Sequence, residues 1–180
     1  MDASCLPRPQ RRHVRQRRHG HLGQAAYRCA KLQRLLNQCL VFARGTPGLT
    51  PEESYARLRQ GLLADFLIAS SNALTMDGKL VNLDATGNRV AAMCFGPKKV
   101  ILVVGLNKVA PDLETAMARV KHHAAPINAI RLGRATPCVE TGLCTDCKSP
   151  ERICYMWSII EGHMLANRIH VKLVGEDLGY

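Results

Sequence analysis

The chain has 180 residues, 47% of them hydrophobic, so it can bury one good core but is too short for two full domains. No apolar run approaches the roughly 18 residues that a membrane span needs, which predicts a soluble, cytoplasmic protein without a membrane partner. The net charge of +11 is uneven: residues 1–49 hold ten Lys and Arg against one acid, and residues 50–180 hold fifteen against thirteen. The basic character therefore belongs to the N-terminus and not to the body of the protein.

Residues 1–23 mix Arg, His and Gln without apolar periodicity, which predicts a disordered basic tail. Such a tail can bind phosphates without sequence specificity, so nucleic-acid binding is the weakest functional alternative. One Trp, three Phe and four Tyr provide no recognisable stacking platform, and nucleic acid is therefore not an expected partner. Residues 24–46 are expected to form a helical connector, because apolar side chains recur at helical spacing at Leu32, Leu35, Leu36, Cys39 and Leu40.

The sequence patterns that predict secondary structure become clearer from residue 50 onward. Thr50-Pro51-Glu52-Glu53 is a capping box with proline at the first helical position, which predicts a helix to about Leu63. Residues 64–69 are expected to form a buried strand that ends at Ser70-Ser71-Asn72. Residues 73–75 and 79–83 then predict a hairpin around Met76-Asp77-Gly78.

A short helix is expected next, ending near Gly96-Pro97. Residues 100–104 are apolar at every position, so both faces of this strand are expected to be covered, as in the middle of a helix-flanked parallel sheet. Pro111 begins a helix whose last turn holds His122 and His123, and residues 169–174 form a final strand. This alternation predicts that residues 47–180 are one three-layer α/β domain with a mostly parallel sheet.

Ligands bind beyond the carboxyl ends of the strands in such sheets. Three loops there supply the candidate ligand-binding residues Asn72, Gly87, Asn88, Arg89, Asn107 and Lys108. Arg89 offers a planar fork and Lys108 a point charge, which together suit a small anionic metabolite. The structural alternative is that Gly87 only makes a turn, Asn88 caps a helix and Lys108 is a solvated surface charge.

Four cysteines lie within seventeen positions, at Cys138, Cys144, Cys147 and Cys154. No secretory signal suggests an oxidising compartment, so a metal or redox centre is the first hypothesis. Four thiolates suit zinc or an iron–sulfur cluster; the iron–sulfur cluster is slightly favoured, although the spacing alone does not decide between them. The alternatives are unliganded thiols or a reversible disulfide between Cys144 and Cys147.

The segment behind this loop bears on the reactivity of its last cysteine. Ser149-Pro150-Glu151 reads as a helix start, which would put Cys154 in a first turn where the helix dipole favours a thiolate. The remaining cysteines are expected to take no part in the centre. Cys39 and Cys94 read as small core residues, Cys5 lies in the predicted tail, and Cys29 lies in the connector.

Several short motifs between residues 71 and 179 carry a family resemblance. They are Ser71-Asn72-Ala73, Asp77-Gly78-Lys79-Leu80-Val81-Asn82, Gly87-Asn88-Arg89-Val90-Ala91-Ala92-Met93, Phe95-Gly96-Pro97-Lys98-Lys99-Val100, Ala125-Pro126-Ile127-Asn128-Ala129, Thr136-Pro137-Cys138, Ser149-Pro150-Glu151-Arg152-Ile153-Cys154, Arg168-Ile169-His170-Val171 and Gly175-Glu176-Asp177-Leu178-Gly179. With these motifs the chain resembles the lactate-utilisation (LUD) domain family, most closely its short bacterial members. The resemblance covers roughly residues 47–180 and stops before about Pro47.

This resemblance implies a Rossmann-like α/β fold, similar to that of the sugar-phosphate isomerases and CoA transferases. It also implies lactate or related carboxylate metabolism, or the electron transfer that serves it. The better-known relatives work in multi-protein systems that oxidise lactate to pyruvate, so iron–sulfur oxidoreductase proteins are expected partners. The resemblance does not establish catalysis by this chain. A non-catalytic redox or metal-sensing module, built on the cysteine loop, is therefore the main alternative.

Overall fold

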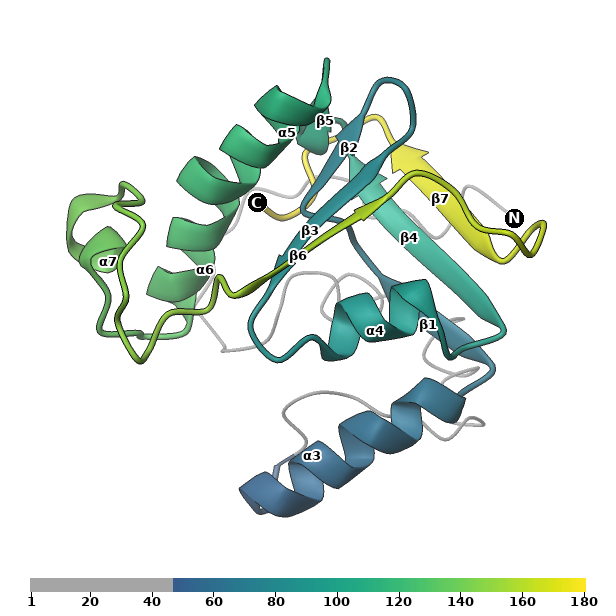
Figure 1. The fold of residues 1–180 in the computed structure, drawn as a ribbon, viewed down its shortest axis with the longest axis horizontal. Coiled ribbons are helices and arrows are strands. Elements are labelled where there is room, and N and C mark those ends of the chain that lie inside the picture. Colours follow the sequence, from purple (N-terminus) through teal and green to yellow (C-terminus); the bar gives the residue numbers. More distant parts are fainter. Residues whose placement is uncertain (1–46) are drawn as a thin grey trace, which may run out of the picture.

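The computed structural model describes residues 47–180, which form a mixed α/β arrangement with two small sheets (Figure 1). The predicted tail of residues 1–23 and the predicted connector of residues 24–46 lie outside the described residues. Within residues 47–180, every helix is too short or too polar to cross a membrane.

The first described helix, α3 (Pro51–Gln60), begins as the sequence predicts. The hydroxyl of Thr50 accepts a hydrogen bond from the Glu53 amide at 3.2 Å, and the Thr50 amide donates to the Glu53 carboxylate at 2.8 Å. This reciprocal cap satisfies two amides that a helix start otherwise leaves unpaired. A short 3₁₀ turn, η2 (Gly61–Leu63), then leads toward the first strand.

Three parallel strands form the first sheet in the order β1-β4-β7: β1 (Phe66–Ala69), β4 (Lys99–Gly105) and β7 (Ile169–Val174). Val100 of the central strand lies between Leu67 and Ile169 in the register. One face of β4 is fully buried, because Val100, Leu102 and Val104 pack with Met93 of helix α4 (Asn88–Cys94).

A second sheet has the order β5-β2-β3-β6: β5 (Val109–Ala110), β2 (Ala73–Thr75), β3 (Leu80–Asp84) and β6 (Met156–Ile160). The predicted hairpin is confirmed in β2 and β3, which turn at Gly78 with φ +95°. One face of this sheet packs against a long helical stretch: α5 (Leu113–Arg119), the π-helical η4 (Val120–Ala124) and α6 (Ala125–Arg131). That stretch continues well past the expected end at His122 and His123.

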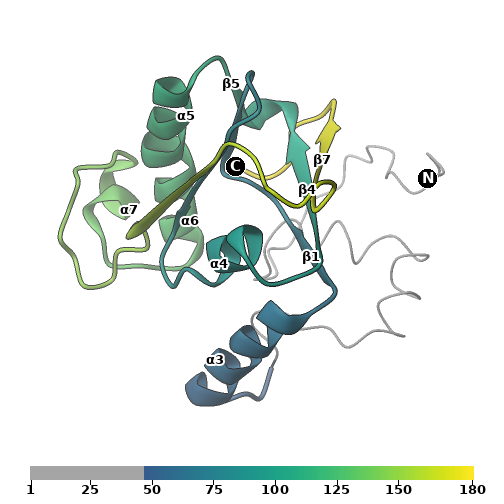
Figure 2. The ribbon, with the colours of Figure 1, turned by 45° about the vertical axis from the view of Figure 1, so that its right-hand side comes forward.

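The predicted fold class is confirmed, since three of the five strand pairings are parallel and helices pack against the strands. The strands divide between two sheets, however, where one was expected. The strand predicted at residues 64–69 was expected to be buried, but Phe66 is 62% and Ile68 46% exposed. Only one face of β4 is fully buried, because the described helices that contact the sheet pack on that side alone (Figure 2).

The helix predicted behind Ser149 is wrong. Residues 150–151 form a turn, and residues 152–155 continue without regular structure to β6. The Ser149 hydroxyl accepts from the Glu151 amide at 3.2 Å and donates to the Ala135 carbonyl at 3.0 Å, so it fixes a turn instead of capping a helix. Cys154 therefore precedes a strand, and the expected helix dipole does not act on its thiol. The loop holds one short helix earlier on, α7 (Pro137–Thr141).

Candidate functional site: a strand-end polar cluster and a cysteine cavity

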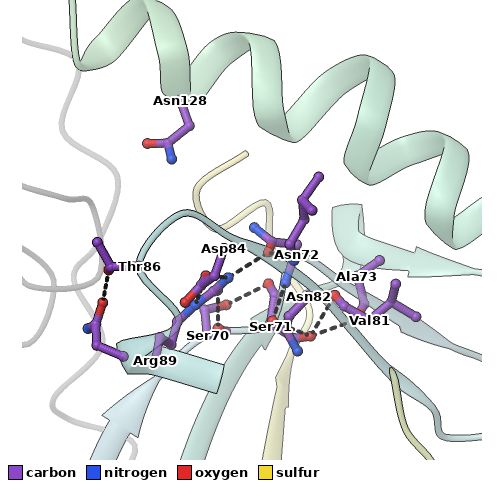
Figure 3. Close-up of polar contacts among 12 residues, drawn as sticks. Ser70, Ser71, Asn72, Ala73, Val81, Asn82, Asp84, Thr86, Arg89 and Asn128 are labelled. Carbon is purple, nitrogen blue, oxygen red and sulfur yellow. Dashed lines mark hydrogen bonds and ion pairs between the residues drawn. The ribbon is translucent and has the colours of Figure 1, made fainter. Parts of the chain in front are cut away.

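Polar side chains gather where β1 and β3 end (Figure 3). Ser70 and Asn72 lie between β1 and β2, and Asp84 is the last residue of β3. The neighbouring helix α4 contributes Arg89 from its first turn. We call this group, together with Lys108 and Arg119, the strand-end cluster.

Arg89 already has an acidic partner inside the protein. Its Nε and Nη2 donate to one oxygen of Asp84 at 3.0 and 2.6 Å. Its Nη1 donates to the Ser70 carbonyl at 3.0 Å, and Nη2 also reaches Oδ1 of Asn72 at 2.7 Å. The guanidinium of Arg89, which was expected to bind a ligand, therefore joins α4 to the ends of β1 and β3.

Asn72 joins three elements through its side chain and backbone. Its Oδ1 accepts from the Leu83 amide at 3.0 Å as well as from Arg89, and its own amide donates to Asn82 at 3.2 Å. Its carbonyl accepts from Arg119 at 2.7 Å. These contacts hold the loop between β1 and β2 in one position, so groups attached to it are well placed before any ligand arrives.

Lys108 is the unusual member of the cluster. It ends the short turn η3 (Leu106–Lys108) behind β4, and it is only 4% exposed. Its ammonium donates to the hydroxyl of Ser70 at 3.1 Å, and within residues 47–180 it forms no ion pair with a carboxylate. Burial, followed by repulsion from Arg119 and Arg89, lowers the pKa of Lys108 to about 8.

Arg119, the last residue of α5, is a second cation that the sequence analysis did not single out. It donates to the carbonyls of Asn107 at 2.9 Å and Asn72 at 2.7 Å, and burial lowers its pKa. In the described part of the chain it too lacks a carboxylate partner. The sequence pattern could have predicted its inward position, because Arg119 lies three residues after buried Ala116 on the core-facing side of the helix.

The two other predicted residues, Gly87 and Asn88, have roles in the turn before α4. Gly87 precedes α4 with φ +77°, and a Cβ there would lie 3.1 Å from the sulfur of Met156. Oδ1 of Asn88 accepts from the hydroxyl of Thr86 at 2.6 Å. The structural interpretation accounts for Gly87, but the cap expected from Asn88 is wrong: Gly87 is the N-cap, Asn88 is the first residue of α4, and no side chain caps this helix start. The ligand-binding role of the six residues remains a prediction. The structure brings together Asn72, Arg89, Asn107 and Lys108. Gly87 and Asn88 shape the adjoining turn.

The last residues cover the cluster. Asn107 donates to the Gly179 carbonyl at 3.1 Å and accepts from the Leu178 amide at 3.2 Å. Gly105 permits this close approach, because a Cβ there would lie 2.5 Å from the Leu178 nitrogen. A Cβ on Gly179 would in turn lie 3.4 Å from the Lys108 ammonium. Residues 176–180 therefore pack over Lys108.

The four loop cysteines line one small cavity together with Lys121 and Arg152. Its volume is about 20 Å³, which is room for about one water molecule or one ion. All four cysteines are free thiols, and Cys138 Sγ lies 3.2 Å from the Thr136 hydroxyl. Across residues 47–180, no three His, Cys, Asp or Glu side chains are grouped closely enough to hold a metal ion.

Two cations accompany these thiols. Arg152 donates to the Cys147 carbonyl at 2.9 Å and to the Cys154 carbonyl, while its buried Nε has no hydrogen-bond partner among residues 47–180. Lys121 pairs with Asp146, and that contact, aided by nearby Cys144 and Cys154, raises the pKa of Lys121. The cavity thus combines soft sulfur atoms with positive charge.

Of the four cysteines expected to stand apart, only Cys94 belongs to the described residues. It is exposed and lies 3.7 Å from the Ser158 hydroxyl, so the expectation that it is a core residue is wrong. It is not among the cavity's lining residues.

Comparisons with known proteins bear on this arrangement. The sequence model of the LUD domain matches residues 28–174, starting within the segment that the sequence analysis treated as a connector. A crystal structure of a DUF162 family protein from Deinococcus radiodurans is similar over 81% of this chain and 84% of that one, with 18% identity and a TM-score of 0.36. No curated protein matches the chain.

Proposed function

The chain belongs to the LUD domain family, and from this premise we propose that it binds a small carboxylate, such as lactate or a related hydroxy acid, at Lys108 and Arg119. Its role is then in lactate or related carboxylate metabolism. The observation that carries this proposal is a pair of buried or half-buried cations without an acidic partner among residues 47–180.

A buried cation without a counter-charge is costly, because the protein interior replaces water poorly. The ammonium of Lys108 contacts a neutral hydroxyl, and Arg119 contacts two neutral carbonyls. A bound carboxylate would supply the missing negative charge. It would also raise the pKa of Lys108 back toward its ordinary value, since an anion favours the protonated amine.

Arg89 has a different part in this proposal. Its charge is already balanced by Asp84, so it positions the Ser70–Asn72 loop and does not form the principal contact with the ligand. This assignment changes the expectation from the sequence, in which the Arg89 fork held the anion. The chain itself would hold the carboxylate, and oxidation would require iron–sulfur oxidoreductase proteins as partners.

Titration calorimetry with sodium lactate, pyruvate and glycolate at pH 7 tests the proposal. Lys108→Met keeps the length of the side chain and removes its charge, so it should weaken binding about tenfold or more. Lys98→Met is the matched control, because Lys98 is a surface lysine paired with Asp65. Absence of binding by the wild type, or equal affinity in Lys108→Met, would contradict the proposal.

A second candidate function is supported by the cysteine cavity. We propose that Cys138, Cys144, Cys147 and Cys154 hold a metal centre when their loop closes around an ion, because all four line the same cavity although they span seventeen positions. In the described residues no three of these thiols are grouped closely enough to hold a metal as they stand, so the loop has to tighten on binding. The cavity volume of about 20 Å³ suits a single zinc ion better than an iron–sulfur cluster. Lys121 and Arg152 would offset the negative charge of a tetrathiolate site.

Metal analysis and an absorption spectrum after anaerobic purification test this candidate. One equivalent of zinc is expected, and the double variant Cys144→Ser/Cys147→Ser should lose it. Cys94→Ser, at an exposed cysteine that does not line the cavity, should retain the metal. Sub-stoichiometric zinc and iron in the wild type would contradict the metal proposal. A Cys144–Cys147 disulfide in an alkylated peptide map would then support the redox-module alternative.

A further inference from the structure

Lys108 differs from the other described lysines whose pKa is shifted. Lys79, Lys98 and Lys121 each pair with an aspartate, and this contact raises their pKa. Lys108 is buried, and desolvation together with repulsion from two arginines lowers its pKa to about 8. Near pH 8, about half of the Lys108 side chains are therefore neutral amines, and the neutral amine is the nucleophilic form of lysine.

The groups around this amine suit chemistry at a carbonyl carbon. The Ser70 hydroxyl lies 3.1 Å from the Lys108 nitrogen and is itself buried, so it can pass a proton to or from that nitrogen. Arg119 uses Nε and Nη1 for two backbone carbonyls, and residues 47–180 give its Nη2 no partner. A guanidinium keeps its charge at physiological pH, so a ligand carboxylate can pair with Arg119 while Lys108 loses its proton.

We propose, on the basis of the carboxylate site proposed above, that Lys108 forms a covalent imine with the ketone carbon of a small 2-oxo acid, such as pyruvate, whose carboxylate is held by Arg119. Lactate carries a hydroxyl in place of the ketone. It can therefore bind the same cations, but the amine cannot attack it in this way. The site then distinguishes a 2-oxo acid from the matching 2-hydroxy acid by a covalent bond.

The reaction needs only the amine and the oxo acid. The nitrogen lone pair attacks the ketone carbon, and the π electrons of the carbonyl move to its oxygen. Both hydrogens of the neutral amine end on that oxygen, which leaves as water when the carbon–nitrogen double bond forms. The Ser70 hydroxyl is placed to relay these protons, because it can accept one from the nitrogen and donate one to the oxygen.

The segment that covers Lys108 favours the imine over its hydrolysis. Residues 176–180 pack over this side chain, and a Cβ on Gly179 would lie 3.4 Å from the Lys108 nitrogen. Asn107 holds the segment through the Gly179 carbonyl and the Leu178 amide. An oxo acid enters when this segment moves aside, and the return of the segment keeps water from the carbon–nitrogen double bond.

Reductive trapping in the full-length protein tests the imine. Sodium pyruvate with sodium cyanoborohydride converts an imine into a stable secondary amine, which adds the mass of one pyruvate less one oxygen atom. Peptide mass mapping should find this adduct at Lys108 at least about tenfold more often than at exposed Lys98 and Lys172, because a larger fraction of Lys108 is neutral. Trapping at Lys108 should also saturate with pyruvate concentration. Trapping no greater than at the exposed lysines would overturn the proposal.

Arg119→Met tests the placement of the carboxylate while Lys108 stays in the chain. Trapping at Lys108 should fall about tenfold or more, because the cation that holds the carboxylate is lost. Arg131→Met is the matched control, since Arg131 is an exposed arginine that contacts Asn128. Unchanged trapping in a folded Arg119→Met variant would contradict the proposal. Acetone, which has the ketone and lacks the carboxylate, should be trapped poorly by the wild type, and this readout does not depend on the folding of a variant.

Lactate separates the imine from the carboxylate site on which it depends. Excess lactate should protect Lys108 of the wild type from trapping by pyruvate, because both acids pair with the same cations. Calorimetric binding of lactate without any pyruvate adduct at Lys108 would leave the carboxylate site standing and refute the imine. Absence of both would refute the two together. An adduct that saturating lactate does not reduce would contradict a shared site.

Discussion

The strand-end cluster and the cysteine cavity differ in how their side chains are held. In the cluster, Arg89, Asn72 and Arg119 are fixed by hydrogen bonds that join β3, α4, α5 and the loop after β1. In the cavity, the thiols belong to a long loop whose carbonyls are held chiefly by Arg152. In the functions proposed above, the first region would be ordered before its ligand binds, whereas the second would be organised by its ion.

The largest expected effect comes from breaking the anchor of the cluster. Arg89→Ala leaves Asp84, which is 12% exposed, without its cation, so we expect a loss of about 3 kcal/mol in the free energy of unfolding. Lys98→Ala, which removes the exposed pair with Asp65, should cost less than about 1 kcal/mol. Urea denaturation measures both. Similar losses in the two variants would mean that the cluster is not anchored by this pair.

The pH dependence of stability tests the burial of Lys108. Its pKa is about 8 in the folded chain and 10.5 in the unfolded chain, so between these pH values the unfolded chain binds more protons. The free energy of unfolding should therefore rise with pH across this window, by about 2 to 3 kcal/mol from Lys108. Lys108→Met should lack this rise. Saturating lactate should reduce it, because the anion keeps Lys108 protonated.

Urea titrations of the wild type and Lys108→Met at pH 7.5 and pH 10 provide the comparison. The difference between the two proteins isolates Lys108 from other titrating groups. Parallel changes in both would show that Lys108 is better solvated than its burial indicates.

A smaller effect is expected where the last residues cover the cluster. Gly105→Ala brings a Cβ within 2.5 Å of the Leu178 nitrogen, so residues 176–180 must shift, at a cost of about 1 to 2 kcal/mol. Amide exchange at Leu178 should increase while the α5 amides stay protected. Unchanged exchange at Leu178 would show that the segment adapts without detaching.

The smallest effect is expected at the cavity in the metal-free protein. Cys144→Ser replaces a partly exposed free thiol by a hydroxyl of similar size, so metal-free stability should change by less than about 0.5 kcal/mol. Zinc should raise the melting temperature of the wild type and not of this variant. A large loss without metal would instead make Cys144 a packing residue, and the contrast between the two regions would disappear.

Local sequence determined the elements whose signals are short-range. The capping box at Thr50, the hairpin turn at Gly78 and the strand at residues 169–174 follow from caps, turn residues and apolar runs. The same reasoning brought Asn72 and Lys108 together, because they follow the parallel strands β1 and β4, whose carboxyl ends share an edge. Arg89 was also expected there, but it comes from α4 behind the antiparallel strand β3 and reaches the cluster through Asp84 and Ser70. The Ser149 signal failed, because a serine hydroxyl can fix a turn as readily as it caps a helix.

Tertiary structure alone decided which charges are balanced. The sequence cannot show that Asp84 takes the fork of Arg89, or that Lys108 and Arg119 are left with neutral partners, because these contacts join residues far apart in the chain. It also cannot show that β6 completes a second sheet or that one side of β4 stays open. An apolar run records that a strand can be buried, while its burial depends on what packs against each face.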